Sequence, residues 1–487
     1  MKRITLIAFA LASVAAGVGA GARPAAAGAN LCVAHHPGCY QTLQAAVDAA
    51  HDGDTIHIDR GTFAGGVTVD VSVSIVGAGA SQTTISGGGP VLTLGVYQAA
   101  TEPTISVSGV TITGGNNTTQ PDSTVTFGGG VWIPQSQVQS TGATVSISDS
   151  VITGNTVTPS QTLAGSFCGS PNPCAFGDGG GIDNAGVLTL TNTVISNNQA
   201  GTPGGVGSGL GDGGIHNRFI GTLVMRHCQV TGNRAIAGPP NGTGSSDGGI
   251  GDDGPMTITD SVVSNNTATV QNAGASDDGS FAGGIGITGF AGASVTIGNT
   301  TIGNNRVSDT NTSGDAGTYA GGIFLDVGAS LVLDTAAVNS NSVSSTGSGG
   351  AFTDGGGMEL DGIATVTRTV IAGNSIAASA QSGPTFAQGG GVANTGTATF
   401  RSVLVLGNSV SVQGPGGVAQ GGGIWNSRFD DSAPLPSLTL IDSIVTANSV
   451  TASSGTTPQG GGVFSIAPVS RTNTLIAGNR PDQCVGC

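Results

Sequence analysis

The chain has 487 residues and almost no basic side chains. Lys2 is its only lysine, and lysine and arginine together number 13 against 28 acidic residues, which gives a formal net charge of −15. A surface with this charge offers no basic patch for nucleic acid or anionic lipid. It would also repel acidic polysaccharides unless a divalent cation bridged the two. Nucleic acid is therefore excluded as a partner.

Charged and aromatic residues are also scarce, at 8% and 4% of the chain, whereas glycine is abundant with 87 residues. Disordered chains usually combine high charge with little hydrophobicity. Here aliphatic residues recur at regular spacing, as in VLTLTNTVI at 187–195. The low charge therefore indicates an ordered chain.

Long hydrophobic runs are confined to the N-terminus. Lys2, Arg3, an apolar stretch and the small residues at 27–29 form the pattern of a secretory signal peptide, so we expect residues 1–29 to be removed. The apolar stretch is too short for a membrane anchor, and no other segment could span a bilayer. The sequence predicts a secreted or cell-surface protein whose mature chain has 10 arginines, no lysine and a net charge of −18.

A repeat fills the chain from residue 128 to residue 480. After a first interval of 51 residues, its units are 32 to 39 residues long. Each unit begins with a glycine pair and an aliphatic residue, and it ends with an asparagine that stands three positions after a β-branched residue. The aliphatic residues are Val131, Ile182, Ile215, Ile250, Ile285, Ile323, Met358, Val392, Ile424 and Val463. The asparagines are Asn155, Asn198, Asn233, Asn266, Asn305, Asn341, Asn374, Asn408, Asn448 and Asn479.

A period of this length is typical of a solenoid, a propeller or an array. Two-residue alternation of Val, Ile and Thr excludes helical repeats, and each unit is too short and too poor in aromatics for a four-stranded propeller blade. One coil of a parallel β-helix per unit fits the pattern best. Equivalent positions then stack about 4.8 Å apart, so the β-branched column predicts an internal aliphatic ladder. The asparagine column predicts an amide ladder at a turn with left-handed geometry.

The first part of the body has a different pattern. Leu43, Ala46, Val47 and Ala50 share one face of a helix expected within residues 40–53, for which Thr42 is the N-cap. Such a helix would cover the open end of the solenoid core. We expect first coils over 54–127, repeat coils over 128–480 and a terminal cysteine pair within 481–487, all in one domain over 30–487.

The segment TLQAAVDAAHDGDTIHIDRGTF, followed by SIVGAG, resembles the N-terminal cap of right-handed parallel β-helix proteins of the pectate-lyase-like superfamily. The alternation of GG-[IVM] with [IV]-x-x-N is similar to repeats of bacterial surface β-helix passenger domains. The resemblance covers residues 40–480 and implies an all-β, right-handed parallel β-helix of roughly ten to fourteen coils with an N-terminal capping helix. A fold of this kind does not by itself carry an activity.

Polar side chains gather on three consecutive units. Positions one and three after the aliphatic residue should face outward. These positions hold Asp183, then His216 and Arg218, then Asp253, which form a candidate acid–base constellation for a sugar substrate. The alternative is a solvated face with a few cross-strand ion pairs.

Carboxylates also precede the glycine pairs on the same units. Stacked with backbone carbonyls, they could bind Ca²⁺, and the candidate ligands are Asp178, Asp212, Asp247 and Asp252. The alternative is aspartate in turns, bonded to its own backbone. A second acidic set, Asp326, Glu359 and Asp361, gives a weaker signal for the same ion. The sequence predicts no other cofactor.

The seven cysteines fit an oxidising compartment. They form three local pairs, Cys32 with Cys39, Cys168 with Cys174, and Cys484 with Cys487. The remaining Cys228 lies in a column of small residues, which predicts a buried free thiol.

Two functions fit these observations. The first is a non-catalytic, monomeric scaffold, secreted or at the cell surface, that binds glycans or another surface through its variable loops. The second is a secreted polysaccharide lyase or glycoside hydrolase that uses the coils around residues 178–253. The scaffold is favoured because motifs of catalytic relatives are missing, among them the Arg-x-Pro-x-x-Arg stretch of pectate lyases.

Overall fold

The computed structural model describes residues 28–118, 125–137, 140–158, 176–201, 211–237, 247–272, 280–289, 292–429, 432–453 and 455–487. The expected signal peptide lies outside the described residues except for its last two positions, and so does the expected Cys168–Cys174 pair. The one helix of the described chain is too short to cross a membrane.

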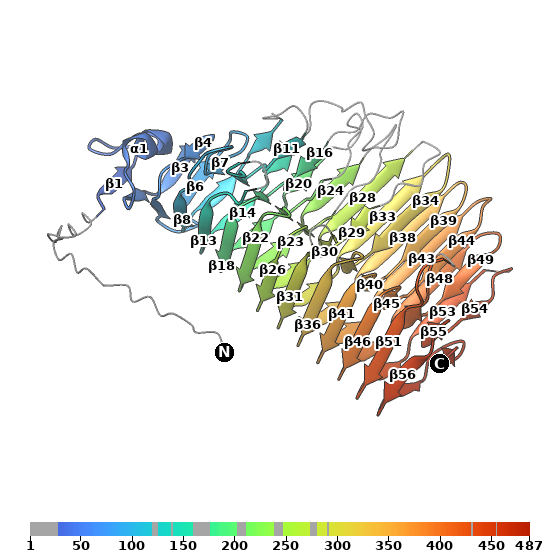
Figure 1. Cartoon of the computed structure of the whole chain (residues 1–487). Coiled ribbons are helices and arrows are strands. Elements are labelled where there is room, and N and C mark those ends of the chain that lie inside the picture. Colours follow the sequence, from blue (N-terminus) through green and yellow to red (C-terminus); the bar gives the residue numbers. More distant parts are fainter. Residues whose placement is uncertain are drawn as a thin grey trace, which may run out of the picture.

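The chain winds into a right-handed parallel β-helix, as the repeat and the resemblance predict (Figure 1). Every strand pair in the three long sheets is parallel, and each sheet takes one strand from each coil. Sheet I has 14 strands, from β1 (Asn30–Val33) to β56 (Val469–Thr472), and sheet II has 13, from β3 (Gly61–Ala64) to β57 (Leu475–Ala477). These numbers agree with the expected ten to fourteen coils.

Sheet III contains the aliphatic residue that follows the glycine pair in every repeat unit. It has 13 strands. They are β4 (Val67–Val69), β7 (Leu92–Leu94), β12 (Val131–Ile133), β17 (Ile182–Asn184), β21 (Ile215–Asn217), β25 (Ile250–Asp252), β30 (Ile285–Ile287), β35 (Ile323–Leu325), β40 (Met358–Leu360), β45 (Val392–Asn394), β50 (Ile424–Asn426), β55 (Val463–Ser465) and β58 (Cys484–Val485).

Two further sheets extend the later coils to one side. Sheet IV has ten strands, from β10 (Asn116–Asn117) to β53 (Ser449–Ala452), and sheet V has six, from β29 (Ser280–Ala282) to β54 (Pro458–Gln459). A complete coil such as the one that begins at β35 therefore runs through sheets III, I, II, IV and V before it returns to sheet III. Sheet V consequently places its strand ends, such as Asp354 of β39 (Ala351–Asp354), just before the glycines that lead into sheet III.

The core between the three long sheets is aliphatic, because inward positions alternate along each strand. Helix α1 (Leu43–Ala49) covers its N-terminal end, with Leu43, Ala46 and Val47 buried and the Thr42 hydroxyl accepting from the amide of Ala45 at 3.2 Å.

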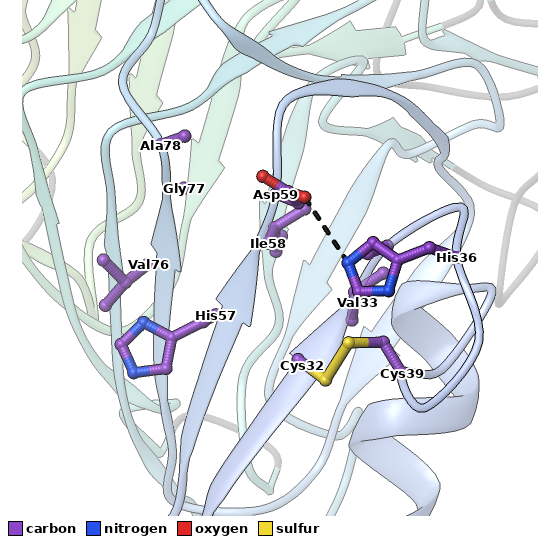
Figure 2. Close-up of a pocket in the computed structure, with 11 residues that line it drawn as sticks. Cys32, Val33, His36, Cys39, His57, Ile58, Asp59, Val76, Gly77 and Ala78 are labelled. Atoms are coloured by element: carbon purple, nitrogen blue, oxygen red, sulfur yellow. Dashed lines mark ion pairs between the residues drawn. A yellow bond between two sulfur atoms is a disulfide. The ribbon is translucent and has the colours of Figure 1, made fainter.

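A Cys32–Cys39 disulfide lies beside this cap, next to a 290 Å³ pocket where His36 and Asp59 approach to 3.8 Å (Figure 2). The Cys484–Cys487 disulfide is also present, and Cys228 is a buried free thiol as expected.

The asparagine column forms a continuous amide ladder from Asn155 to Asn479. At Asn305, for example, Nδ2 donates to the Asn341 Oδ1 and to the Val263 carbonyl, both at 3.0 Å, while Oδ1 accepts from the Asn266 amide and side chain. The left-handed geometry expected for these asparagines lies elsewhere. It falls on the preceding residue, as at Asn304 (φ 56°), because the ladder side chain must point inward to reach its neighbours.

Replacing Asn305 by Ala should destabilise the coils around it by about 2–4 kcal/mol, because the buried Val263 carbonyl and Asn266 amide both lose their partner. Urea unfolding followed by far-UV circular dichroism would measure this loss. Gln413→Ala, which removes an exposed amide from sheet IV, is the matched control. Equal unfolding midpoints for the two variants would show that the ladder contributes nothing beyond an ordinary surface amide.

Candidate active site

Three neighbouring strands of sheet III, β17, β21 and β25, position the polar residues that surround His216. The register pairs Asp183 of β17 with His216 of β21, and His216 with Gly251 of β25. A Cβ atom at Gly251 would overlap the carboxyl group of Asp212. The glycine therefore leaves the space in which Asp212 approaches His216.

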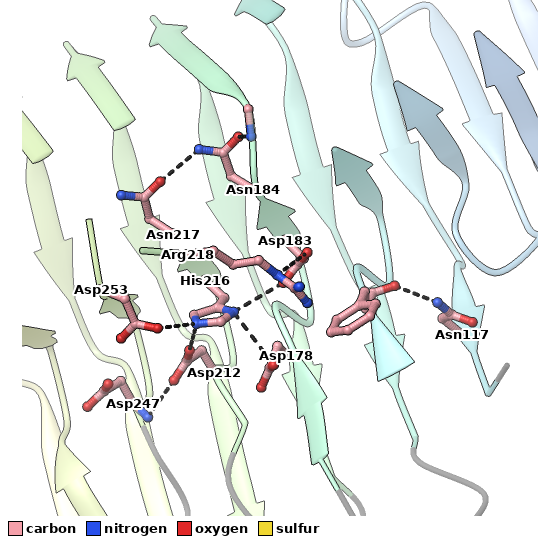
Figure 3. Close-up of polar contacts among 12 residues, drawn as sticks. Asn117, Asp178, Asp183, Asn184, Asp212, His216, Asn217, Arg218, Asp247 and Asp253 are labelled. Atoms are coloured by element: carbon pink, nitrogen blue, oxygen red, sulfur yellow. Dashed lines mark hydrogen bonds and ion pairs between the residues drawn. The ribbon is translucent and has the colours of Figure 1, made fainter. Parts of the chain in front are cut away.

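His216 lies at the centre of four carboxylates (Figure 3). Its Nδ1 atom is 3.1 Å from Oδ2 of Asp183 and 3.7 Å from Oδ2 of Asp178. On the other side of the ring, Nε2 is 3.3 Å from Oδ2 of Asp253 and 3.9 Å from Oδ2 of Asp212. The imidazole thus bridges carboxylates from three coils.

Arg218 is fixed by two contacts on the same side of the cluster. Its Nε atom donates to both carboxylate oxygens of Asp183 at 3.1 Å. Its guanidinium carbon lies 3.6 Å above the centre of the Phe127 ring, a cation–π contact. The Nη2 atom is buried and has no hydrogen-bond partner among the residues that the structure describes.

The environment changes the pKa values of these groups in opposite directions. Burial alone would lower the pKa of His216, but Asp178, Asp183, Asp253 and Asp212 together raise it well above its ordinary value. For Asp253 the signs are reversed. Burial alone would raise its pKa, but its hydrogen bond to His216 and the charges of His216 and Arg218 lower it below its ordinary value. His216 is therefore a cation and Asp253 an anion at neutral pH.

Two other carboxyl groups hold their protons more tightly. Burial raises the pKa of Asp178 to about 6 and that of Asp212 to about 7, against the opposing charge of His216. The Asp178 side chain is 18% exposed, whereas that of Asp212 is 5% exposed. Of the two carboxyl groups with a raised pKa, Asp178 is therefore the one that a ligand can reach.

The structure brings the two predicted sets of residues together into one cluster. Asp178 and Asp212, expected as calcium ligands, surround the same imidazole as Asp183 and Asp253, expected as catalytic groups. One expectation is wrong: Asp183 does not face solvent but is fully buried, because His216 and Arg218 bond to it from the next coil.

Asp247 and Asp252 lie at the margins of this cluster. The Asp247 amide donates to Oδ1 of Asp212 at 3.0 Å, and its carboxylate accepts from the amide of Ala282. Asp252 belongs instead to an inward amide row, in which Asn184 donates to Asn217 and Asn217 donates to Asp252, each at 2.7 Å. Burial raises the Asp252 pKa to about 8. The four expected calcium ligands therefore do not converge on one point.

A smaller set does have metal-binding spacing. One donor atom each from Asp178, Asp212 and His216 lie within 4.8 Å of one another. Two carboxylates and an imidazole suit a transition metal better than Ca²⁺, which takes oxygen ligands. An ion there would have to displace the proton that the carboxylates hold on His216.

Sequence reasoning missed the aromatic residues at one side of the cluster. Phe127, under Arg218, also stacks on Trp132 at a centroid distance of 6.0 Å, and Tyr97 lies 6.0 Å from the same indole. Phe127 precedes its glycines as Asp178 does one coil later, and the strands that contain them are paired. Alignment of the repeat units at this position would have placed its ring beside the cluster.

The second acidic set lies four coils further along sheet III. Glu359 occupies the same repeat position as Asp183 and His216, and Asp354 occupies that of Asp178. Glu359 is fully buried, and within the described part of the chain neither carboxylate oxygen has a hydrogen-bond partner. Burial, together with the charges of Asp361, Asp354 and Asp326, raises its pKa well above the ordinary value. The position equivalent to His216 on the following coil is Ala393, so the histidine has no counterpart beside Glu359.

The fold and the cluster define a parallel β-helix protein with a histidine–arginine–carboxylate site on sheet III. The sequence matches no protein-family model and no curated protein. Among solved structures, the A-module of the mannuronan C-5 epimerase AlgE4 of Azotobacter vinelandii is similar, with 14% identity, coverage of 90% of this chain and 91% of its own, and a TM-score of 0.33. The catalytic domain of a GH87 α-1,3-glucanase has 12% identity, coverage of 93% and 70%, and a TM-score of 0.30. A family 28 exopolygalacturonase of Yersinia enterocolitica has 9% identity, coverage of 90% and 75%, and a TM-score of 0.26.

Proposed function

We propose that this protein is a secreted glycoside hydrolase that cleaves a neutral polysaccharide at the His216 cluster. One observation carries the proposal: two solvent-accessible carboxyl groups flank the imidazole, and their pKa values are displaced in opposite directions. Divergent pKa values within a carboxyl pair are what separates a general acid from a base.

Asp178, with a pKa of about 6, is the general acid and gives its proton to the glycosidic oxygen as the bond from that oxygen to the anomeric carbon breaks. Asp253 is the base and removes a proton from the water whose oxygen bonds to that carbon. The sum of the two steps adds one water across the bond, and solvent then returns Asp253 and Asp178 to their starting states.

The cation His216 holds both carboxyl groups in place. Asp183 is a positioning residue, since it bonds to both His216 and Arg218 and is fully buried.

The charge of the whole chain supports an uncharged substrate. The chain is acidic, with a formal net charge of −15. A polyuronate would therefore be repelled from a distance. Neutral glucans, xylans and mannans meet no such penalty.

The test is release of new reducing ends from a panel of neutral and acidic polysaccharides, with chelator or with added Mn²⁺. We expect release from a neutral polymer in both conditions. Release from polyuronates alone would contradict the proposed substrate, and release only with Mn²⁺ would assign Asp178, Asp212 and His216 to a metal. A folded protein that binds a polymer without cleaving it would be the glycan-binding scaffold instead.

The rate should fall as the pH rises through about 6, because Asp178 must hold its proton to act as the acid. It should also fall at low pH, where Asp253 becomes protonated, although its lowered pKa moves that limb well into the acid range. Initial rates between pH 3 and pH 9 give the profile. An optimum above pH 8 would rule out Asp178 as the acid.

A further inference from the structure

A pocket of about 420 Å³ lies beside sheet III, three to five coils from the His216 cluster. The turns that follow β35, β40 and β45 form its floor, and the segment that follows β50 forms its wall. The turns after β40 and β45 have two residues each, 361–362 and 395–396, whereas the segment after β50 is longer. Its described residues in the pocket are Arg428, Phe429, Ala433, Pro434 and Leu435, which line the same space as residues of earlier coils.

Large apolar side chains are exposed around this pocket. Phe429 is 55% exposed, Leu435 57% and Val327 69%. The Phe429 ring lies on the buried Trp425 at a centroid distance of 5.1 Å and an interplanar angle of 27°, and the Trp425 Nε1 atom donates to the Gln420 side chain. A supported aromatic face of this kind is held open to solvent rather than folded into the core.

Hydrogen-bonding groups also line the pocket. Oδ1 of Asp361 accepts from the Thr395 hydroxyl at 2.5 Å, which leaves Oδ2 to bond to a ligand. Arg428 donates to the carbonyl of Ala433 at 2.9 Å, a hydrogen bond between two residues of the segment after β50. An aromatic face in one pocket with a carboxylate and a hydroxyl suits a sugar ring, which has apolar C–H faces and a hydroxyl rim.

The pocket and the cluster share one row of equivalent positions. The strand register places Asp253, Thr288, Asp326 and Asp361 on four consecutive coils, directly after paired strands. The Thr288 hydroxyl donates to Oδ1 of Asp253 at 2.6 Å, so the row is continuous at its first step. Three coil spacings separate Asp253 from Asp361, about 14 Å. A short oligosaccharide spans that distance.

We propose that this pocket is a remote subsite for the polysaccharide chain, with one sugar stacked on Phe429 and hydrogen-bonded to Asp361. The proposal rests on the proposed function for its ligand class. It adds that the enzyme distinguishes long chains from short ones, because only a chain that reaches from the cluster to Phe429 gains the additional contact.

The test compares Phe429→Ala with wild type and with Leu475→Ala, which removes an exposed apolar side chain from sheet II. Binding to soluble β-glucan, xylan and galactomannan is measured by affinity electrophoresis, and hydrolysis is measured on oligosaccharides of increasing length from the polymer that is cleaved. Phe429→Ala should weaken binding to that polymer about tenfold. It should raise KM for long oligosaccharides and leave the rate on the shortest cleavable one within twofold.

Each result decides something different. If wild type cleaves a polymer and Phe429→Ala matches it on every chain length, the subsite is refuted while the hydrolase stands. If wild type binds a polymer without cleaving it and Phe429→Ala loses that binding, the subsite is supported and the hydrolase refuted. If Leu475→Ala loses as much affinity as Phe429→Ala, the effect is not local to the pocket, and the subsite is refuted.

Discussion

Asp253→Asn is expected to reduce hydrolysis of a neutral polysaccharide about a thousandfold. The amide keeps the size of the side chain and can still accept from Thr288, so the turn after β25 should keep its shape. It cannot take a proton from water. It also removes one of the carboxylates that hold the proton on His216, which lowers the pKa of that imidazole.

The matched control is Asp70→Asn, which makes the same chemical change at an exposed position on an early coil. Reducing-end release under identical conditions should be unchanged in that variant. A loss in Asp253→Ala that added azide restores would further identify the missing group as the base, because this truncation leaves room for a small anion in place of the carboxylate. Full activity in Asp253→Asn would remove this residue from the mechanism and leave Asp178 and Asp212 as the acid–base pair to be tested.

The repeat explains why so much of the fold could be predicted. Each coil must place an aliphatic residue inside and an asparagine at the ladder, so Ile182 and Asn198 recur in equivalent form on every coil. The capping helix could also be predicted from the sequence. Thr42 is a typical N-cap residue, and Leu43, Ala46 and Val47 lie on one apolar helix face. These features depend on neighbours close in sequence or one period away.

The site was only partly predictable, for a physical reason. Alternation along a strand says on which side of sheet III Asp183 lies, but its burial depends on His216 and Arg218 of the next coil. The role of Asp178 was also missed, because its distance from His216 is set by the glycine path into β17. The pocket at Phe429 brings residues from the long segment after β50 together with residues of earlier coils, and the repeat pattern does not predict that contact.

The second large effect is expected at Glu359, where Glu359→Gln should stabilise the protein at pH 8 and change little at pH 4. The folded chain keeps a proton on Glu359 above the ordinary pKa of 4.5, because the side chain is buried among Asp361, Asp354 and Asp326, whereas the unfolded chain releases it. Between that value and the raised folded pKa, the folded state binds more protons than the unfolded state. Its free energy of unfolding therefore falls as the pH rises, by about 1.4 kcal/mol per pH unit for this group.

A glutamine removes this dependence because it never ionises. Unfolding midpoints of wild type and Glu359→Gln, measured from pH 4 to pH 8 with chelator present, should converge at the acid end and diverge by several degrees at the alkaline end. Asp70→Asn, at an exposed site, should follow wild type throughout. Glu359 keeps its proton because it lacks the partners that Asp183 has. Asp183 contacts a histidine and an arginine of the next coil, whereas Glu359 pairs with Ala393 at the position equivalent to that histidine. If Glu359→Gln were less stable than wild type at pH 8, the carboxylate would have to be ionised and compensated, and the account of this buried acid as a proton-holding group would be wrong.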